Sequence, residues 1–159
     1  MPRILVVCTG NICRSPMAEV LLRQQVEKED VAGWDVESAG TWTVDGERAS
    51  RYAIQLMAER GLDLISHRSR RVNRHIVEQA DLVLVMTQGH SEALRLEFPD
   101  LREKIYMLSE MRNGYRYDID DPYGGPLAEY RACATTLTDL IDAGFERIRS
   151  LAEQPQVEE

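Results

Sequence analysis

The chain has 159 residues and a formal net charge of −8, because 27 Asp and Glu residues outnumber 19 Lys and Arg residues. This acidic balance argues against nucleic acid and anionic membranes as partners, since both repel a negative surface, but a local positive site can still take an anion. The length predicts a single domain. We place this domain at residues 1–153 and expect residues 154–159 to form a flexible polar tail.

Three cysteines, Cys8, Cys13 and Cys133, are too few and odd in number for a disulfide framework. They suit a reducing compartment, in which free thiols persist. The apolar run at residues 4–7 is too short for the core of a signal peptide, and no stretch approaches the length of a membrane span. We therefore expect a cytoplasmic protein.

Strand and helix patterns alternate along the chain. Short apolar, β-branched runs predict strands, and apolar residues at helical spacing predict helices. In chain order we expect a strand at 3–8, a helix at 15–28, a strand at 34–38, helices at 48–60 and 73–79, a strand at 81–86, a helix at 88–97, a strand at 104–108, a long loop at 110–125 and a helix at 127–153.

The alternation predicts a single three-layer α/β domain, with a four-stranded parallel sheet flanked by helices. Ser15 and Pro16 are typical of the cap and first residue of a helix, so a tight loop should join the first strand to the first helix. Ligands of such folds bind beyond the carboxyl ends of the strands. Cys8 lies at such an end, where we expect a phosphate-binding loop.

The segment Cys8-Thr9-Gly10-Asn11-Ile12-Cys13-Arg14-Ser15 combines a thiol, a turn and an arginine at a helix start. Backbone N–H groups in a tight loop form an anion nest, and the helix N-terminus adds partial positive charge. Arg14 offers a fork that matches two phosphate oxygens. These features also stabilise a thiolate at Cys8, which the Ser15 hydroxyl can hydrogen-bond. The loop therefore predicts an activated nucleophile in a phosphate cradle.

The motif Cys8-x5-Arg14-Ser15 resembles the signature of the low-molecular-weight protein tyrosine phosphatases, in their bacterial form. The resemblance covers nearly the whole chain and includes Ser38-Ala39-Gly40, Ser66-His67, residues 80–86 and Asp121-Pro122-Tyr123. It implies a metal-independent hydrolase without cofactors. Such an enzyme removes phosphate from protein phosphotyrosine through a phosphocysteine intermediate.

The resemblance also assigns roles to residues. Cys8 is the nucleophile, Arg14 clamps the phosphate, and Asp121 donates a proton to the leaving group from a loop before the last helix. The role of Asp120, a second carboxylate directly before this acid, stays open. Around the phosphate, the resemblance implies a cradle and supporting network made of Thr9, Gly10, Asn11, Ile12, Cys13, Ser15, Ser38 and His67.

Trp42 and Tyr123 are the candidate walls of the substrate cleft. Where many relatives carry a second tyrosine, this chain has Gly124, which opens one wall. Cys13 has two interpretations that both stay open. In the family such a cysteine can pair with the nucleophile and protect it from irreversible oxidation, and it can equally be a buried thiol that fills a gap.

Ile12 bears on the main alternative, a protein arginine phosphatase of the same fold, because that branch carries Thr at this position. A bulky Ile is expected to crowd phosphoarginine, which favours phosphotyrosine. The run at residues 121–125 occurs in both branches and leaves the alternative open. A thioredoxin-linked arsenate reductase would need two more cysteines between Cys13 and Cys133, and a non-catalytic phosphoprotein-binding module would need neither thiol nor acid.

The expected partners are therefore phosphotyrosine proteins, with no nucleic acid and no membrane. The arginines at positions 68, 70, 71 and 74 then predict a solvated or docking surface. The three histidines show no spacing typical of a metal site. The physiological substrate and the choice between a monomer and a weak dimer stay open.

Overall fold

The computed structural model describes residues 1–154, so nearly all of the expected tail lies outside the described residues. Four parallel strands form one sheet in the order β2-β1-β3-β4. The strands are β1 (Arg3–Cys8), β2 (Asp35–Gly40), β3 (Leu82–Val85) and β4 (Ile105–Met107). The helices are α1 (Arg14–Lys28), α2 (Arg51–Glu59), α3 (Arg74–Gln79), α4 (Gln88–Glu97), the 3-10 helix η1 (Pro99–Lys104), α5 (Glu110–Asn113) and α6 (Leu127–Ala152).

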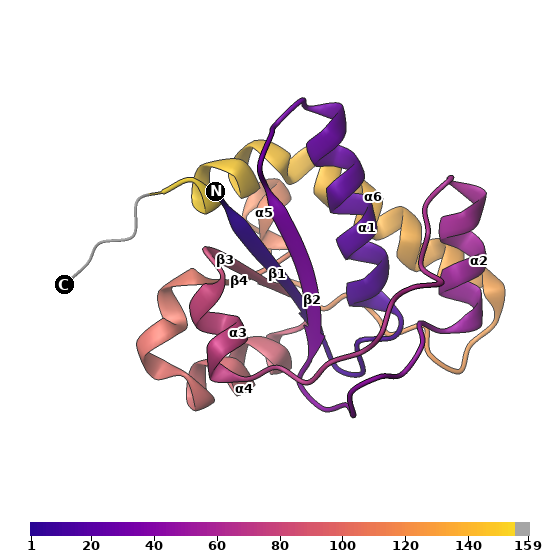
Figure 1. Ribbon diagram of the computed structural model, residues 1–159, viewed down its shortest axis with the longest axis horizontal. Helices are drawn as coiled ribbons and strands as arrows, with labels where there is room; N and C mark the ends of the chain where they lie inside the picture. Colours follow the sequence, from indigo (N-terminus) through magenta and orange to yellow (C-terminus); the bar gives the residue numbers. More distant parts are fainter. Residues whose placement is uncertain (155–159) are drawn as a thin grey trace.

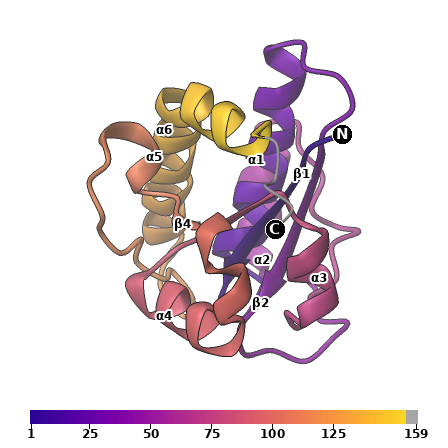
Figure 2. The same cartoon turned by 90° about the vertical axis from the view of Figure 1, so that its left-hand side faces the viewer.

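Helices cover both faces of the sheet, and the strand pleat divides the core between them (Figure 1). Ile4 and Val6 of β1 join one buried cluster with residues of α1, α2 and α6. Leu5 and Val7 join a second cluster with residues of α3 and α4. Figure 2 shows α5 beside α6, consistent with their extensive contact. The predicted three-layer α/β fold with its parallel sheet is confirmed.

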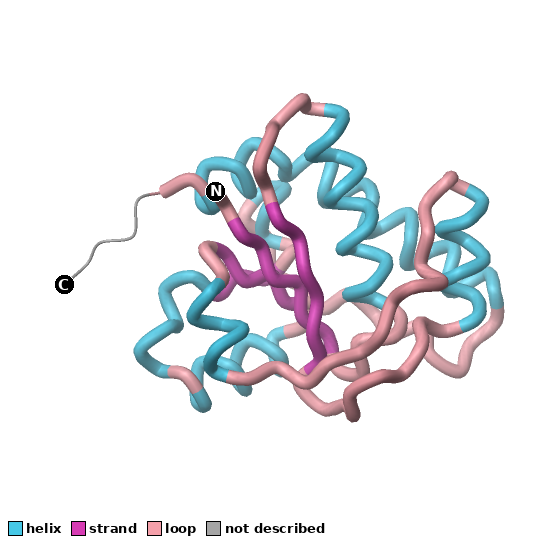
Figure 3. Tube along the Cα trace, viewed as in Figure 1, coloured by secondary structure: helices cyan, strands magenta, loops and turns pink. Residues whose placement is uncertain are grey.

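The carboxyl ends of the strands meet at one edge of the sheet, where Cys8 pairs with Gly40 across β1 and β2. Figure 3 shows loops gathered at this edge. A Cβ atom at Gly40 would lie only 2.5 Å from the carbonyl oxygen of Thr9. A residue without a side chain is therefore required where β2 passes the loop that follows β1.

Two local expectations are wrong. Helix α1 begins at Arg14 with Cys13 at its N-cap, so Ser15 lies in the first turn and does not cap the helix. Its hydroxyl instead contacts the Cys8 thiol, a hydrogen-bond partner that a serine at the N-cap would not reach. The expected loop at 110–125 contains the short helix α5, which ends at Gly114 with a positive φ of 77°. No helix within residues 1–154 is long and apolar enough to span a membrane.

Candidate active site

The Cys8 thiol lies at the carboxyl end of β1, beside the first turn of α1. Its Sγ is 3.0 Å from the Ser15 Oγ, and both residues are buried. The Asn11 Nδ2 donates to the same Ser15 oxygen at 2.8 Å. The single Ser15 proton can go to the Cys8 sulfur or to the Ala39 carbonyl oxygen, which lies 3.5 Å from the Ser15 Oγ, and the sulfur is the nearer of the two. The arrangement places a hydrogen-bond donor on the sulfur in its thiolate form.

The backbone of residues 8–12 turns its carbonyl groups outward. Four of them accept hydrogen bonds from surrounding segments. These are the carbonyls of Cys8, Thr9, Asn11 and Ile12, which accept from Thr41 N, Trp42 N, His67 Nε2 and Ser50 N at 2.9, 3.0, 2.7 and 2.8 Å respectively. A trans peptide directs its N–H group opposite to its C=O group. The following N–H groups therefore face the inside of the loop, which is the geometry of an anion nest.

Asn11 holds this loop in shape. Its φ is +55°, a left-handed conformation that asparagine tolerates better than most residues. Its Nδ2 donates to the Ser38 Oγ at 3.0 Å, and its Oδ1 accepts from the Arg70 backbone N–H at 3.0 Å. Because His67 Nε2 approaches a carbonyl oxygen, which can only accept, that nitrogen carries the proton. The structure thus brings Asn11, Ser38 and His67 together as the sequence predicted.

Gly10 lies in the same loop, but the surrounding protein atoms do not explain why this position is a glycine. A Cβ atom there would make only an ordinary 3.6 Å contact with Ile12. Ile12 itself is half-buried and packs against the larger core cluster.

The Arg14 guanidinium is buried beneath the loop and held on several sides. Its Nη1 donates to the Ile119 carbonyl at 2.8 Å, and its Nη2 lies 3.4 Å from both the Thr9 Oγ1 and the Asp121 Oδ2. Among residues 1–154 its buried Nε has no hydrogen-bond partner. A buried, unsatisfied guanidinium N–H is costly unless an acceptor occupies the site, and an oxyanion would supply one.

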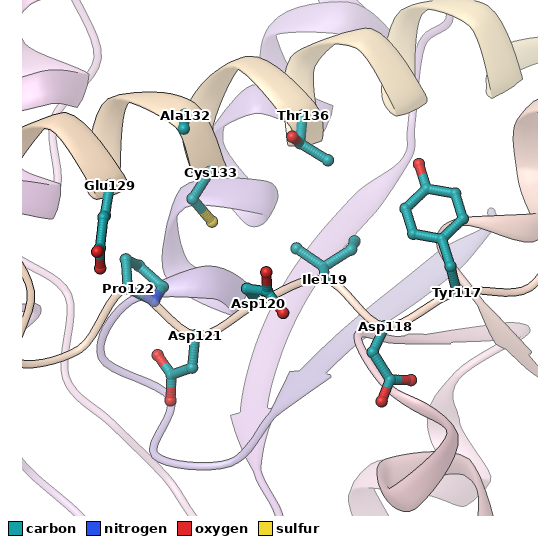
Figure 4. Close-up of a pocket in the computed structure, with 10 residues that line it drawn as sticks. All are labelled: Tyr117, Asp118, Ile119, Asp120, Asp121, Pro122, Glu129, Ala132, Cys133 and Thr136. Carbon is teal, nitrogen blue, oxygen red and sulfur yellow. The ribbon is translucent and has the colours of Figure 1, made fainter.

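The Asp121 carboxylate reaches this guanidinium from the segment before α6. The Asp121 side chain is 44% exposed, whereas the Arg14 side chain is 5% exposed, so the pair links a buried cation to a carboxylate that solvent can reach. The Asp121 Oδ1 accepts from the Tyr123 backbone N–H at 3.1 Å. Figure 4 shows Asp121 and Asp118 pointing away from α6. The Asp118 Oδ1 accepts from the Gln88 backbone N–H at 2.8 Å.

A cavity of about 510 Å³ lies on the other side of this segment, against α6. Asp120 lines it together with Glu129 and Cys133, whose side chains extend from α6 toward the segment (Figure 4). Burial raises the pKa of the Cys133 thiol to about 12, so this thiol stays protonated. These groups lie behind the acid rather than beside Cys8.

Cys13 faces the core. Its Sγ is 3.3 Å from the Ser50 Oγ and 3.4 Å from the Tyr130 hydroxyl, and all three cysteines are free thiols. Burial is the main reason that the pKa of the Cys13 thiol is raised. Its pairing with Cys8 under oxidation stays a prediction.

The two candidate walls are open to solvent. Trp42 is 78% exposed and Tyr123 is 67% exposed. Trp42 is anchored by its backbone N–H, which donates to the Thr9 carbonyl, while Tyr123 follows directly on Asp121 and Pro122.

His90 belongs to the site, although the sequence argument used it only to discount metal. It lies in the first turn of α4, three residues after the N-cap Thr87, and its Nε2 is 2.7 Å from the Thr9 Oγ1. The available signal was topological, because β3 neighbours β1 and the residues after both strands meet at one edge. The backbone partners from Ile119 and Arg70 carry no comparable signal, since any residue supplies those atoms. Within residues 1–154 no three His, Cys, Asp or Glu side chains are grouped to hold a metal ion.

The family model for low molecular weight phosphotyrosine protein phosphatase matches residues 3–154. The chain therefore belongs to this family of cysteine-based hydrolases.

Individual relatives include both arginine phosphatases and tyrosine phosphatases. A protein-arginine-phosphatase from Geobacillus stearothermophilus is 39% identical over 93% of this chain and 97% of its own. A probable low molecular weight protein-tyrosine-phosphatase, EpsP, from Ralstonia solanacearum is 37% identical over the same shares. The crystal structure of a low molecular weight protein tyrosine phosphatase from T. tengcongensis superposes with a TM-score of 0.86, at 36% identity, over 92% of this chain and 99% of that one.

Proposed function

We propose that this protein hydrolyses phosphotyrosine in proteins, with Cys8 as nucleophile, Arg14 as phosphate clamp and Asp121 as general acid. The observation that carries the proposal is the set of four outward carbonyls around Cys8, which turn backbone N–H groups toward the space above the thiol. Such a nest binds three phosphate oxygens while leaving phosphorus open to the sulfur.

The first step transfers the phosphoryl group to sulfur. The Cys8 thiolate attacks phosphorus, so an S–P bond forms as the P–O bond to the tyrosine oxygen breaks. Asp121 gives its proton to that oxygen and becomes a carboxylate. Arg14 and the loop N–H groups hold the charge on the equatorial oxygens. Tyrosine departs as the neutral phenol.

The second step returns the enzyme to its starting state. The Asp121 carboxylate takes a proton from water, whose oxygen attacks phosphorus as the S–P bond breaks. The bonding electrons return to Cys8 as thiolate, which the Ser15 hydroxyl stabilises. Inorganic phosphate leaves. Every proton and electron pair is supplied by the two residues and water, so the scheme involves no metal or cofactor.

Phosphoarginine is the competing substrate, and two of the comparisons favour it. The Geobacillus relative is named as an arginine phosphatase, and so is a solved structure with a TM-score of 0.85. Against it stands Ile12, whose side chain is fixed by core packing and whose carbonyl is held by the Ser50 N–H. A branched apolar side chain beside the nest offers no hydrogen-bond partner to a guanidinium.

The deciding experiment compares peptides carrying phosphotyrosine, phosphoarginine and phosphoserine, with reductant and EDTA present. We expect turnover of phosphotyrosine that is lost in Cys8→Ser and unaffected by EDTA. The matched variant Ile12→Thr should shift the ratio of kcat/KM values toward phosphoarginine. A wild-type preference for phosphoarginine would reassign the substrate, and no turnover of any peptide would refute the phosphatase proposal itself.

We also infer that the protein works in the cytoplasm. The support is chemical, since the proposed nucleophile is active only as a reduced thiol, and Cys8, Cys13 and Cys133 are all free. The partners inferred from the activity are phosphorylated proteins.

A further inference from the structure

His90 is a buried histidine that neither step of the proposed mechanism uses. It is 6% exposed, and its Nε2 makes a 2.7 Å hydrogen bond with the Thr9 Oγ1. Its other ring nitrogen, Nδ1, is buried and has no hydrogen-bond partner among residues 1–154. A polar ring half satisfied in the interior costs stability, so hydrophobic packing alone does not explain it.

Thr9 links this ring to the phosphate clamp. Its Oγ1 also lies 3.4 Å from the Arg14 Nη2, which can only donate. The Thr9 oxygen therefore accepts from Arg14, and its own proton is free to go to His90. When the His90 Nε2 is bare, Thr9 donates to it and turns a lone pair toward the guanidinium. The contacts form one line from His90 through Thr9 to Arg14 and on to Asp121.

We propose that His90 is a positioning residue, which orients the Thr9 hydroxyl so that Thr9 holds the Arg14 guanidinium in the direction needed to bind the transferred phosphoryl group. This role rests on the proposed phosphatase function, because it acts through the same clamp. Within residues 1–154 the other contacts of the Arg14 guanidinium are the Ile119 carbonyl and the Asp121 carboxylate, which lies on an exposed segment. Losing Thr9 would leave the guanidinium held only by these two, of which the carboxylate is open to solvent.

The protonation state of His90 agrees with this role. Burial, and then the nearby Arg14 charge, lower its pKa to about 4, although Asp118 and Asp121 act in the opposite direction. The ring is therefore neutral at neutral pH, so one of its nitrogens can accept a hydrogen bond and the ring adds no second cation beside Arg14.

The test is a set of variants that separates hydrogen bonding from packing. His90→Gln places an amide near the position of Nε2, whereas His90→Leu fills the space without a polar atom. Thr9→Ser keeps the hydroxyl and Thr9→Val removes it. Each is assayed with p-nitrophenyl phosphate for kcat and KM, and for inhibition by inorganic phosphate, well below its melting temperature.

We expect His90→Leu and Thr9→Val each to lower kcat/KM about tenfold and to weaken phosphate inhibition by a similar factor. His90→Gln and Thr9→Ser should stay within about threefold of wild type. The double variant His90→Leu/Thr9→Val should lose no more than Thr9→Val alone, because both act through one contact.

Three results would overturn the proposal: wild-type kinetics in His90→Leu, equal impairment in His90→Gln, or losses that multiply in the double variant. A melting temperature lowered in His90→Leu with unchanged kinetics would show that His90 only supports the fold. Failure of the phosphatase proposal would be seen separately, as a wild-type protein that does not turn over p-nitrophenyl phosphate. In that case phosphate binding by the same variants, measured by calorimetry, still decides whether His90 positions the clamp.

Discussion

The phosphate loop, residues 8–15, and the acid segment, residues 114–126, meet at Arg14 but are built in opposite ways. The phosphate loop is largely buried, and side-chain or backbone groups from three other segments, at residues 41–42, 50 and 67, bind its carbonyl groups. The acid segment is mostly exposed. Besides Arg14, it is tied to the sheet side by hydrogen bonds from the Ile119 N–H to the Met86 carbonyl, from the Gln88 N–H to Asp118 and from the Tyr117 N–H to the Ser109 Oγ.

The difference matches what each region has to do. A nest stabilises a charged phosphoryl group only if its dipoles are already aligned before the group arrives, so the loop must be rigid. A general acid must lose a proton, let the product leave and admit water, so its segment needs access to solvent. Asn11 keeps a positive φ, which most residues disfavour, and its three side-chain hydrogen bonds hold it in that conformation.

The largest effect is expected from the acid segment, in Asp121→Asn. The amide cannot protonate the leaving oxygen, so kcat for a phosphotyrosine peptide should fall roughly 10²- to 10³-fold. With p-nitrophenyl phosphate, whose leaving group needs little protonation, the loss should be about tenfold. The melting temperature should stay within about 2 °C because the side chain is exposed. Equal losses of kcat with both substrates would contradict the assignment of Asp121 as the acid.

The phosphate loop should show the largest effect on stability, in Asn11→Ala. This change removes three side-chain hydrogen bonds and forces alanine into a left-handed conformation, so the free energy of unfolding should fall by about 3 kcal/mol. Urea denaturation measures it. Asn11→Gly keeps the backbone freedom and should be about 1 kcal/mol less damaging than Asn11→Ala.

Asp118→Ala is the matched control from the acid segment. It removes one exposed hydrogen bond and should cost no more than about 1 kcal/mol. Similar losses of stability in Asn11→Ala and Asp118→Ala would show that the two regions are equally rigid, against the comparison.

His90 gives the comparison a dependence on pH. Its pKa is about 4 in the folded chain and about 6.5 in the unfolded chain. Between these two pH values the unfolded chain therefore binds a proton at His90 and the folded chain does not. Stability contributed by the neutral ring is therefore present above pH 6.5 and lost toward pH 4, by up to about 3 kcal/mol. Urea denaturation at pH 7, 5.5 and 4.5 should show a smaller loss for His90→Gln than for wild type. Parallel losses would mean that His90 titrates normally.

The sequence predicted the strands and the loop well because their signals are local. A β-branched run followed by a glycine-containing turn and a helix start leaves few alternatives for residues 3–28. The N-cap was predicted two residues too late, at Ser15 instead of Cys13, and the Ser15 hydroxyl contacts the Cys8 thiol rather than the helix end. Local capping rules do not register such a competitor.

The partners that sequence reasoning missed come from distant segments. His90 and Ile119 reach Thr9 and Arg14 only after β3 is placed beside β1 and the segment before α6 folds over α1. Ile119 acts through its carbonyl, which no side-chain pattern can reveal. The sequence therefore indicates candidate catalytic residues by their side-chain types, whereas the groups that hold those residues are found only once the chain is folded.

The smallest effect is expected at the exposed walls, where Tyr123→Ala should change the free energy of unfolding by less than about 0.5 kcal/mol. If Tyr123 packs against the substrate ring, KM for a phosphotyrosine peptide should rise roughly fivefold, the size of one aromatic contact. Inhibition by inorganic phosphate should not change, since phosphate has no ring. Tyr115→Ala is the control, because Tyr115 is 73% exposed on the same segment and lies outside the proposed site. An unchanged KM in Tyr123→Ala would show that Tyr123 is not a wall of the substrate cleft. The contrast between the buried loop and the open segment would still hold, because it depends on hydrogen bonds to the two backbones and not on this aromatic side chain.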